Sequence, residues 1–194
     1  MQAEIVMIGT ELLLGQIVDT NATYLAQQLR DLGLNLYYKT TVGDNKDRIR
    51  AVLQQAHERS DVVITSGGLG PTLDDLTREA IAEAVGVPLV FRQDLMDQIA
   101  RRFARLGRTM SPNNRRQAYI PEGAIPFENP RGTAPIFAFE DSQGIIVALP
   151  GVPHELKYLM EHTIVPYLKQ RLGINELIKY RTLRTTGIGE SQVD

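Results

Sequence analysis

The chain has no cysteine among its 194 residues. Disulfide bonds, thiolate metal sites and cysteine nucleophiles are therefore excluded. It also lacks a strong charge of either sign, because 21 Lys and Arg against 23 Asp and Glu give a formal net charge of -2. No overall field then attracts nucleic acid or an anionic membrane. No apolar run approaches the ~20 residues that a membrane-spanning helix needs.

The apolar stretch that follows Met1 is too short for a secretory signal and has no basic flank. We therefore expect a cytoplasmic protein with no membrane partner and no nucleic-acid partner. The content of 43 % hydrophobic and 23 % charged residues is ordinary for a globular chain with a sizeable core. The length predicts one domain, or one domain and a piece of another.

The first half of the chain alternates short apolar runs with amphipathic segments. Strands are predicted at 5–8, 34–42 and 62–64. Helices are predicted after caps at Thr20 or Asn21 and at Asn45, and again over about 75–85, with Gly33 and Gly86 as stops for the first and the last. This order predicts an α/β fold with a mostly parallel sheet and helices on both faces.

The second half is less regular. The pattern predicts a helix over 92–106, a short helix or loop over 111–118, and a hairpin of strands 136–139 and 145–149. A helix over 153–172 should be kinked by Pro166. A strand over 178–186 and a turn into a helix follow, and the chain stops at Asp194. From this ending we expect a longer natural protein.

A glycine-rich segment, Thr65-Ser66-Gly67-Gly68-Leu69-Gly70-Pro71-Thr72-Leu73-Asp74-Asp75, joins a predicted strand to a predicted helix. Open α/β sheets bind ligands at this kind of junction. Glycines let the backbone amides approach a phosphate closely, and the helix N-terminus adds partial positive charge. The segment lacks the Gly-Lys-Ser/Thr ending of a P-loop and the Gly-x-Gly-x-x-Gly spacing.

Two adjacent acids, Asp74 and Asp75, close this segment. Beside a bound phosphate they would repel it, and a divalent cation such as Mg²⁺ resolves the conflict because it binds carboxylates and phosphate oxygens together. The alternative is that both acids only cap the following helix. Joined to three glycines at a strand end, they favour the cation.

Further loops leave the same predicted sheet edge. Glu11 and Asn21 could reach a ribose or a metal, or could be a solvated acid and a helix cap. Asp44 is either a third carboxylate of the site or a turn residue. In two later Pro/Gly loops, Arg131 could contact phosphate and Glu155 could contact metal, although each loop alone is typical of a turn.

Two other patterns are interpreted as unrelated to function. His154, Glu155 and His162 do not have the His-Glu-x-x-His spacing of a zinc site. The basic stretch has no interleaved aromatic residues and is balanced by acids elsewhere, which favours a solvated helix face. Its members are Arg101, Arg102, Arg105, Arg108, Arg115 and Arg116.

The loops together resemble the N-terminal domain of the CinA family of competence/damage-inducible proteins. The matching segments run in order over essentially the whole chain: Ile8 to Gly15 with Asp19-Thr20-Asn21, Val42 to Asn45, Gly67 to Asp75, Asn129 to Pro135, Leu149 to Pro153 and Gly187 to Ser191. The resemblance implies a three-layer α/β/α fold like that of molybdopterin-binding proteins of the MoaB and MogA type. One departure is Ile136, where the family usually has glycine after the Asn-Pro-x-Gly-x-Ala-Pro loop.

The resemblance also implies a domain of residues 1–170, with residues 171–194 as the incomplete start of a small KH-like α/β domain. It implies an ADP-ribose pyrophosphatase that depends on a divalent cation, is stimulated by K⁺ and forms a homodimer. The nicotinamide mononucleotide deamidase activity of longer relatives would belong to a C-terminal domain that these residues do not include. Two alternatives stay open: a nucleotidyl transferase acting on molybdopterin, and a non-catalytic binding and oligomerisation module.

The expected site residues follow from these loops. Asp44 and Asp75 are expected to be catalytic, and Asp74, Asp75 and Glu155 to bind the metal. The substrate would contact a larger set: Gly9, Thr10, Glu11, Asn21, Thr65, Gly67, Gly68, Gly70, Pro71, Thr72, Arg131 and Gly132.

Overall fold

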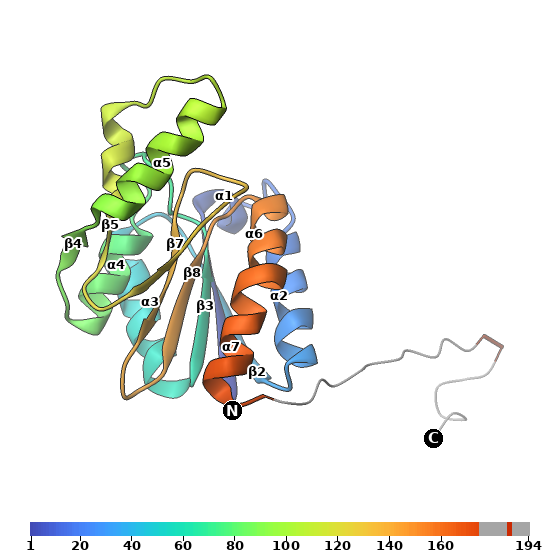
Figure 1. The fold of residues 1–194 in the computed structure, drawn as a ribbon. Coiled ribbons are helices and arrows are strands. Elements are labelled where there is room, and N and C mark those ends of the chain that lie inside the picture. Colours follow the sequence, from blue (N-terminus) through green and yellow to red (C-terminus); the bar gives the residue numbers. More distant parts are fainter. Residues whose placement is uncertain (175–185, 188–194) are drawn as a thin grey trace.

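The computed structural model describes residues 1–174 and 186–187 (Figure 1). Most of the predicted strand over 178–186, of the turn after it and of the expected KH-like segment lies outside these residues. The described chain forms one six-stranded sheet, one two-stranded sheet and the helices that cover them.

The central sheet has the strand order β2-β1-β3-β8-β7-β6. Strands β2, β1, β3 and β8 are parallel to one another, and β7 is antiparallel to both of its neighbours. The mostly parallel sheet and the hairpin of β7 and β8 are therefore confirmed. The bounds are β1 Gln2–Ile8, β2 Asn35–Val42, β3 Val62–Ser66, β6 Ile125–Phe127, β7 Ile136–Glu140 and β8 Ile145–Leu149.

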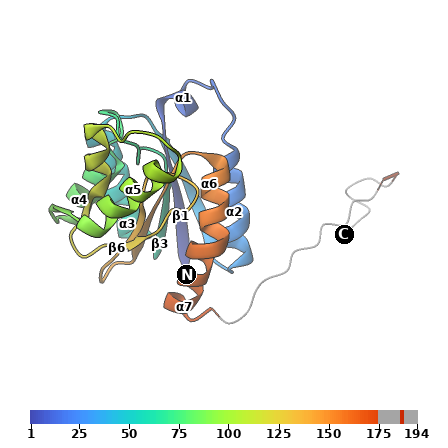
Figure 2. The same ribbon diagram turned by 45° about the horizontal axis from the view of Figure 1, so that its top comes forward.

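Helices cover both faces of this sheet, which makes the predicted three layers (Figures 1 and 2). Helices α2, α6 and α7 lie on one face, and α3 and α4 lie on the other. No described helix has both the length and the apolar character to cross a membrane. The bounds are α1 Thr10–Leu13, α2 Thr20–Asp31, α3 Lys46–Arg59, α4 Thr77–Val85, α5 Gln93–Arg105, η1 Pro112–Ala118, α6 Pro153–Leu159, η2 Met160–Ile164 and α7 Val165–Leu172.

The helix ends mostly follow the sequence signals. The Asn45 side chain caps α3 by accepting from the Arg48 amide at 3.1 Å, and Gly86 ends α4 with a left-handed φ of 74°. The predicted cap of α2 at Thr20 or Asn21 is wrong. Asp19 holds that position, because its carboxylate accepts from the amide of Ala22 at 2.9 Å.

The helix over 153–172 is interrupted by a π-helical turn, η2, directly before Pro166. The irregularity that the proline predicts is therefore present, in the form of a wider turn. Four side chains at spacing four, Leu156, Met160, Ile164 and Leu168, are all fully buried. A regular α-helix would rotate this stripe away from the sheet, because four residues exceed its 3.6-residue turn, and the π turn corrects the drift.

A small insertion lies between α4 and β6 in the chain. It contains an antiparallel pair, β4 Leu89–Phe91 and β5 Tyr119–Pro121, together with α5 and η1. The rings of Phe91 and Tyr119 lie 5.3 Å apart across this pair. Neither strand was predicted. The insertion lies at one side of the central sheet (Figure 1) and forms one wall of the site described below.

The strand order also fixes where a ligand can bind. The chain leaves β1 toward β2 on one side and leaves β3 toward the opposite side of the sheet. The loops after β1 and β3 therefore diverge, and open α/β sheets have their ligand crevice at such a point, outside the carboxyl ends of the strands. The loops after β2, β6 and β8 end at this same edge.

Candidate functional site

A cleft of about 590 Å³ opens at this carboxyl edge of the sheet. It is bounded by the loops after β1, β2, β3 and β8, by the loop before β7, and by η1. Its lining residues are Ile8, Gly9, Glu11, Asp44, Gly67, Gly68, Leu69, Gly70, Pro71, Asp74, Asp75, Gln117, Thr133, Ala134, Pro150, Gly151, Val152, Pro153 and Glu155.

Two glycines at the end of β3 have conformations that other residues rarely adopt. Gly67 has a φ of 110° and Gly68 a φ of 64°. A side chain at Gly67 would collide with the carbonyl oxygen of Ile8, and one at Gly68 would collide with the Thr77 hydroxyl. Both positions therefore need glycine, because another residue would strain the backbone and would not fit the space.

The carbonyl groups of the glycine segment are held from the side of α4. The Thr77 hydroxyl donates to the Gly67 carbonyl at 2.7 Å, and the Thr77 amide donates to the Gly68 carbonyl at 3.2 Å. The Arg78 guanidinium donates to the carbonyls of Leu69 and Gly70, at 2.5 and 2.9 Å. Every carbonyl from 67 to 70 thus points toward α4.

The amides of the same peptide units must point the other way, because the C=O and N–H of a trans peptide are opposed. These are the amides of Gly68, Leu69 and Gly70, all three of which line the cleft. Among the described residues, none of these amides has a hydrogen-bond acceptor. Successive backbone amides that face one cavity form a site for an anion.

Arg78 was not singled out from the sequence, yet it organises this loop. Only 2 % of the residue is exposed. Burial lowers the pKa of its guanidinium from the ordinary value, although the nearby Glu79 and Asp75 oppose the shift. Arginine stays charged in proteins, so the buried cation remains available to hold two carbonyls at once. No motif in the sequence distinguishes this arginine from others in first helical turns.

The two aspartates do not cap a helix, so the capping alternative is wrong. Helix α4 begins only at Thr77, and no side chain caps it. The Asp75 carboxylate instead accepts from the amide and the hydroxyl of Thr72, at 2.8 and 2.6 Å, through one oxygen. Asp74 has no hydrogen-bond donor in the part of the chain that the structure describes, and it faces the cleft.

Asp44 and Thr10 bind each other across the cleft edge. The Thr10 amide donates to Asp44 Oδ2 at 2.9 Å, and the Thr10 hydroxyl accepts from the Asp44 amide at 3.1 Å. Asp44 Oδ1 has no donor within residues 1–174, so one oxygen remains for a ligand. Glu11 also lines the cleft. Thr10 does not line it, because its polar groups are occupied by Asp44.

The loop before β7 is organised by Asn129, which is buried. Its side-chain oxygen accepts from the amides of Arg131 and Gly132, at 3.0 and 2.9 Å. Its nitrogen donates to the Ala134 carbonyl at 2.9 Å and to Glu155 at 3.0 Å. Asn129 was not among the predicted site residues, although the Asn-Pro dipeptide marks its loop. Glu155 thereby keeps one oxygen for the cleft.

Several predicted contact residues lie outside the cleft lining. The Thr65 side chain is fully buried within β3, and the Thr72 hydroxyl is used by Asp75. Asn21 binds the Gly151 carbonyl at 2.8 Å beside a neighbouring cavity of about 100 Å³. The Arg131 guanidinium lies 4.6 Å from the Tyr158 ring centre. Gly132 packs so close to Glu155 that a side chain there would collide with its carboxylate.

Ile136, the departure from the family pattern, is fully buried in β7 and does not line the cleft. The shape of the cleft is therefore not altered directly by this side chain. The remaining predicted residues do line it: Gly9, Glu11, Asp44, Gly67, Gly68, Gly70, Pro71, Asp74, Asp75 and Glu155.

The charge of the cleft is one-sided. Of the residues that the structure describes, five carboxylates line it, and no lysine, arginine or histidine does. The five are Glu11, Asp44, Asp74, Asp75 and Glu155. Across the described ranges, no three acidic or histidine side chains are grouped closely enough to hold a metal ion by themselves. The cleft thus offers backbone donors for an anion and separate carboxylates for a cation.

Known proteins resemble the chain in sequence and in structure. A family model described as "Probable molybdopterin binding domain" matches residues 4–170. A protein of Halothermothrix orenii named "Putative competence-damage inducible protein" is 53 % identical over 194 residues, which are 100 % of this chain and 46 % of that protein. The chain therefore spans slightly less than half the length of such relatives.

Two solved structures share the fold. The protein CinA of Thermoplasma acidophilum superposes with a TM-score of 0.79 at 32 % identity, covering 88 % of this chain and 97 % of that one. The molybdopterin biosynthesis enzyme MoaB of Thermus thermophilus superposes with a TM-score of 0.61 at 20 % identity, covering 89 % and 94 %, which shows likeness of fold alone. The predicted MoaB-like fold is confirmed, and the chain belongs to the CinA family, with a domain of the molybdopterin-binding type.

Proposed function

We propose that the cleft binds ADP-ribose or a closely related nucleotide and hydrolyses its pyrophosphate to AMP and ribose 5-phosphate. One observation carries the proposal. Among residues 1–174, the amides of Gly68, Leu69 and Gly70 are unpaired and face a cavity whose charged lining side chains are all carboxylates. The amides suit a phosphate, and the carboxylates suit a cation that accompanies it. The volume of about 590 Å³ is within the range of small-molecule sites.

The donor set fits a divalent cation such as Mg²⁺. Asp75, Asp74 and Glu155 each keep at least one carboxylate oxygen without a donor among the described residues. Magnesium usually takes one or two carboxylates and completes its shell with phosphate oxygens and water. Such an ion would neutralise charge on the pyrophosphate. The sequence family also implies stimulation by K⁺, for which we propose the same cleft.

The chain's own groups supply the rest of the reaction. The three amides hold one phosphate in place. Thr77 and Arg78 keep their peptides aligned from the side of α4. Asp44 Oδ1 would orient the attacking water and accept its proton. The water oxygen bonds to one phosphorus, the bridging P–O bond breaks, and the bridging oxygen leaves with the other phosphate.

Substitution of Asp75 tests the proposal. The Asp75→Asn variant retains an acceptor for Thr72 but loses the charge, so kcat/KM for ADP-ribose with Mg²⁺ should fall by about 100-fold or more while the melting temperature stays unchanged. Asp47→Asn, which changes an exposed acid in the first turn of α3, is the matched control. Full activity of the Asp75→Asn variant would remove the catalytic role.

A second candidate rests on the family match over residues 4–170 and on the MoaB-like fold. The same loop could serve a molybdopterin compound, in binding or in nucleotidyl transfer. ADP-ribose hydrolysis and molybdopterin adenylylation should be measured side by side on one preparation. A third candidate, binding without turnover, predicts heat of ADP-ribose binding in calorimetry and no AMP. We expect AMP to form.

A further inference from the structure

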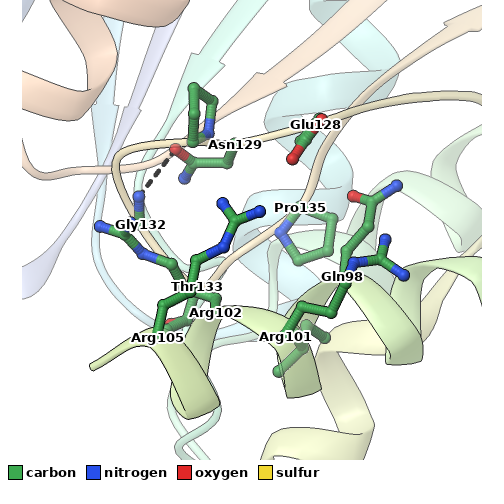
Figure 3. A pocket seen from close by; sticks show the side chains of 11 residues that line it. Gln98, Arg101, Arg102, Arg105, Glu128, Asn129, Gly132, Thr133 and Pro135 are labelled. Carbon is green, nitrogen blue, oxygen red and sulfur yellow. Dashed lines mark hydrogen bonds between the residues drawn. The ribbon is translucent and has the colours of Figure 1, made fainter. Parts of the chain in front are cut away.

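A second, smaller pocket lies between helix α5 and residues 128–135, the segment that leads into β7 (Figure 3). Its volume is about 30 Å³. Figure 3 shows that one wall comes from α5, through Gln98, Arg101, Arg102 and Arg105, and the other from Glu128, Asn129, Gly132, Thr133 and Pro135. Thr133 lines both this pocket and the large cleft, so one segment separates the two.

Three of the lining side chains are arginines, and their charges are not neutralised. Within residues 1–174, none of Arg101, Arg102 and Arg105 forms a salt bridge. Arg101 and Arg105 are four residues apart on one helix, where like charges repel. Glu128 is the single acid of the lining, so the pocket keeps an excess of two positive charges.

Arg102 carries an additional sign of a missing partner. Its Nη2 donates to the Arg131 carbonyl at 2.9 Å. Its Nε is buried and has no acceptor among the described residues. A buried donor of a charged group without an acceptor costs free energy that a bound acceptor would restore. The sequence pattern indicates a solvated helix face for this stretch. Arg101 and Arg105 are exposed, whereas Arg102 is half-buried and its Nε is fully buried.

Several arginines elsewhere in the described chain are paired with acids. Arg59 binds Glu4, Arg92 binds Asp94 and Arg116 binds Glu79, each at 2.8–3.1 Å. The three α5 arginines instead line a cavity. Guanidinium groups are the side chains best suited to phosphate, because their donors match its oxygens in pairs.

We propose that this α5 pocket binds a phosphate group, at a site distinct from the glycine segment of the cleft. The pocket volume accommodates about two water-sized groups, which suits two oxygens of a phosphate and excludes a nucleoside. Bound phosphate would join α5 to residues 128–135 and would fix the wall that Thr133 shares with the cleft. The proposal does not depend on hydrolysis in the cleft.

Inorganic phosphate is the probe. Phosphate should be titrated into the chain with a divalent-metal chelator present. Without a bound cation, the carboxylates of the cleft repel phosphate. Chloride should keep the ionic strength constant, since exposed charges are screened by salt. We expect phosphate to shift the NMR signals of residues 98–105 and 128–133 and to raise the melting temperature above the chloride control.

Paired variants locate the site. The double variant Arg101→Gln, Arg105→Gln should weaken phosphate binding by about tenfold or more. Arg108→Gln, which removes an exposed arginine outside the pocket lining, should leave binding unchanged. Glu128→Gln should strengthen binding, because it removes the one opposing charge. Equal affinity in the double variant and the unmodified chain would overturn the proposal, as would a phosphate effect no larger than that of chloride.

Competition identifies where the phosphate comes from. ADP-ribose should be added with Mg²⁺ to the Asp75→Asn variant with phosphate bound. If ADP-ribose displaces the phosphate, the pocket takes a phosphate of the cleft ligand. If both bind together, the pocket takes free phosphate. The Asp75→Asn variant should lose ADP-ribose turnover in the cleft but keep phosphate binding in the α5 pocket. The two proposals are therefore tested by separate measurements, and failure of one is distinguishable from failure of the other.

Discussion

Charged side chains are arranged differently at the two ends of the central sheet. At the amino end, the buried Glu4 is paired with Arg59 at 2.8 Å, and the buried His57 contacts Asp141 at 3.0 Å. At the carboxyl end, five carboxylates line a cleft with no basic side chain. Charges at the first end therefore hold elements together. Charges at the second end form no salt bridge in the described chain, which is typical of a surface that binds a ligand.

The largest expected effect is on the amino end. Arg59→Ala leaves the Glu4 carboxylate buried with only the Thr40 hydroxyl, at 3.2 Å, and removes the contact with the Tyr38 ring. Breaking a buried pair in this way should lower the free energy of unfolding by about 3 kcal/mol. Urea denaturation measures the change, with Arg48→Ala on the exposed face of α3 as control. A loss no larger than the control's would erase the contrast between the two ends.

A smaller effect concerns pH. Burial alone would raise the pKa of Asp141, but hydrogen bonds from His57, Gln143 and Gly144 lower it overall. A carboxylate with a lowered pKa in the folded chain stabilises the fold above its unfolded pKa of about 4, and the stabilisation is lost as the pH falls through the folded value.

Asp141→Asn should therefore be less stable than the unmodified chain by about 1 kcal/mol at pH 7. The difference should shrink as the pH falls below about 4. Thermal unfolding between pH 3 and pH 7 measures it. A difference that stays constant over this range would show that the charge of Asp141 plays no part.

The smallest effect is expected at the carboxyl end. Asp74→Asn removes one of five like charges and breaks no hydrogen bond among the described residues, so stability should stay within about 0.5 kcal/mol and should not decrease. The same urea experiment measures it. A clear destabilisation would mean that Asp74 has a structural partner, and the two ends would then differ less than we infer.

The sequence predicts every strand of five or more residues in the described part of the chain. Strands β1, β3 and β8 contain short apolar runs, β2 alternates apolar and polar residues, and each was found. Strand β6 contains Pro126, which argues against a central strand, and it lies at the sheet edge where proline is tolerated. Strands β4 and β5 have three residues each and pair across a long separation in sequence, so no local pattern indicates them.

For the site, the loops were predictable and the supporting contacts were not. Glycines and acids at strand ends identify the cleft, because parallel strands bring their carboxyl ends to one edge. Arg78 contacts the loop because the loop folds back over α4. No residue spacing in the sequence predicts that fold. The α5 pocket likewise exists because residues 128–135 fold over Arg102, and its arginines alone resemble an ordinary solvated surface.

The hydrogen bonds from Arg78 to two carbonyls affect how a ligand binds. The glycine segment has its shape before anything binds, since Arg78 holds the carbonyls of Leu69 and Gly70 and Thr77 holds those of Gly67 and Gly68. A phosphate would bind to a loop that is already ordered, so binding would not have to order the backbone. Little conformational entropy would then be lost when an anion binds to these amides.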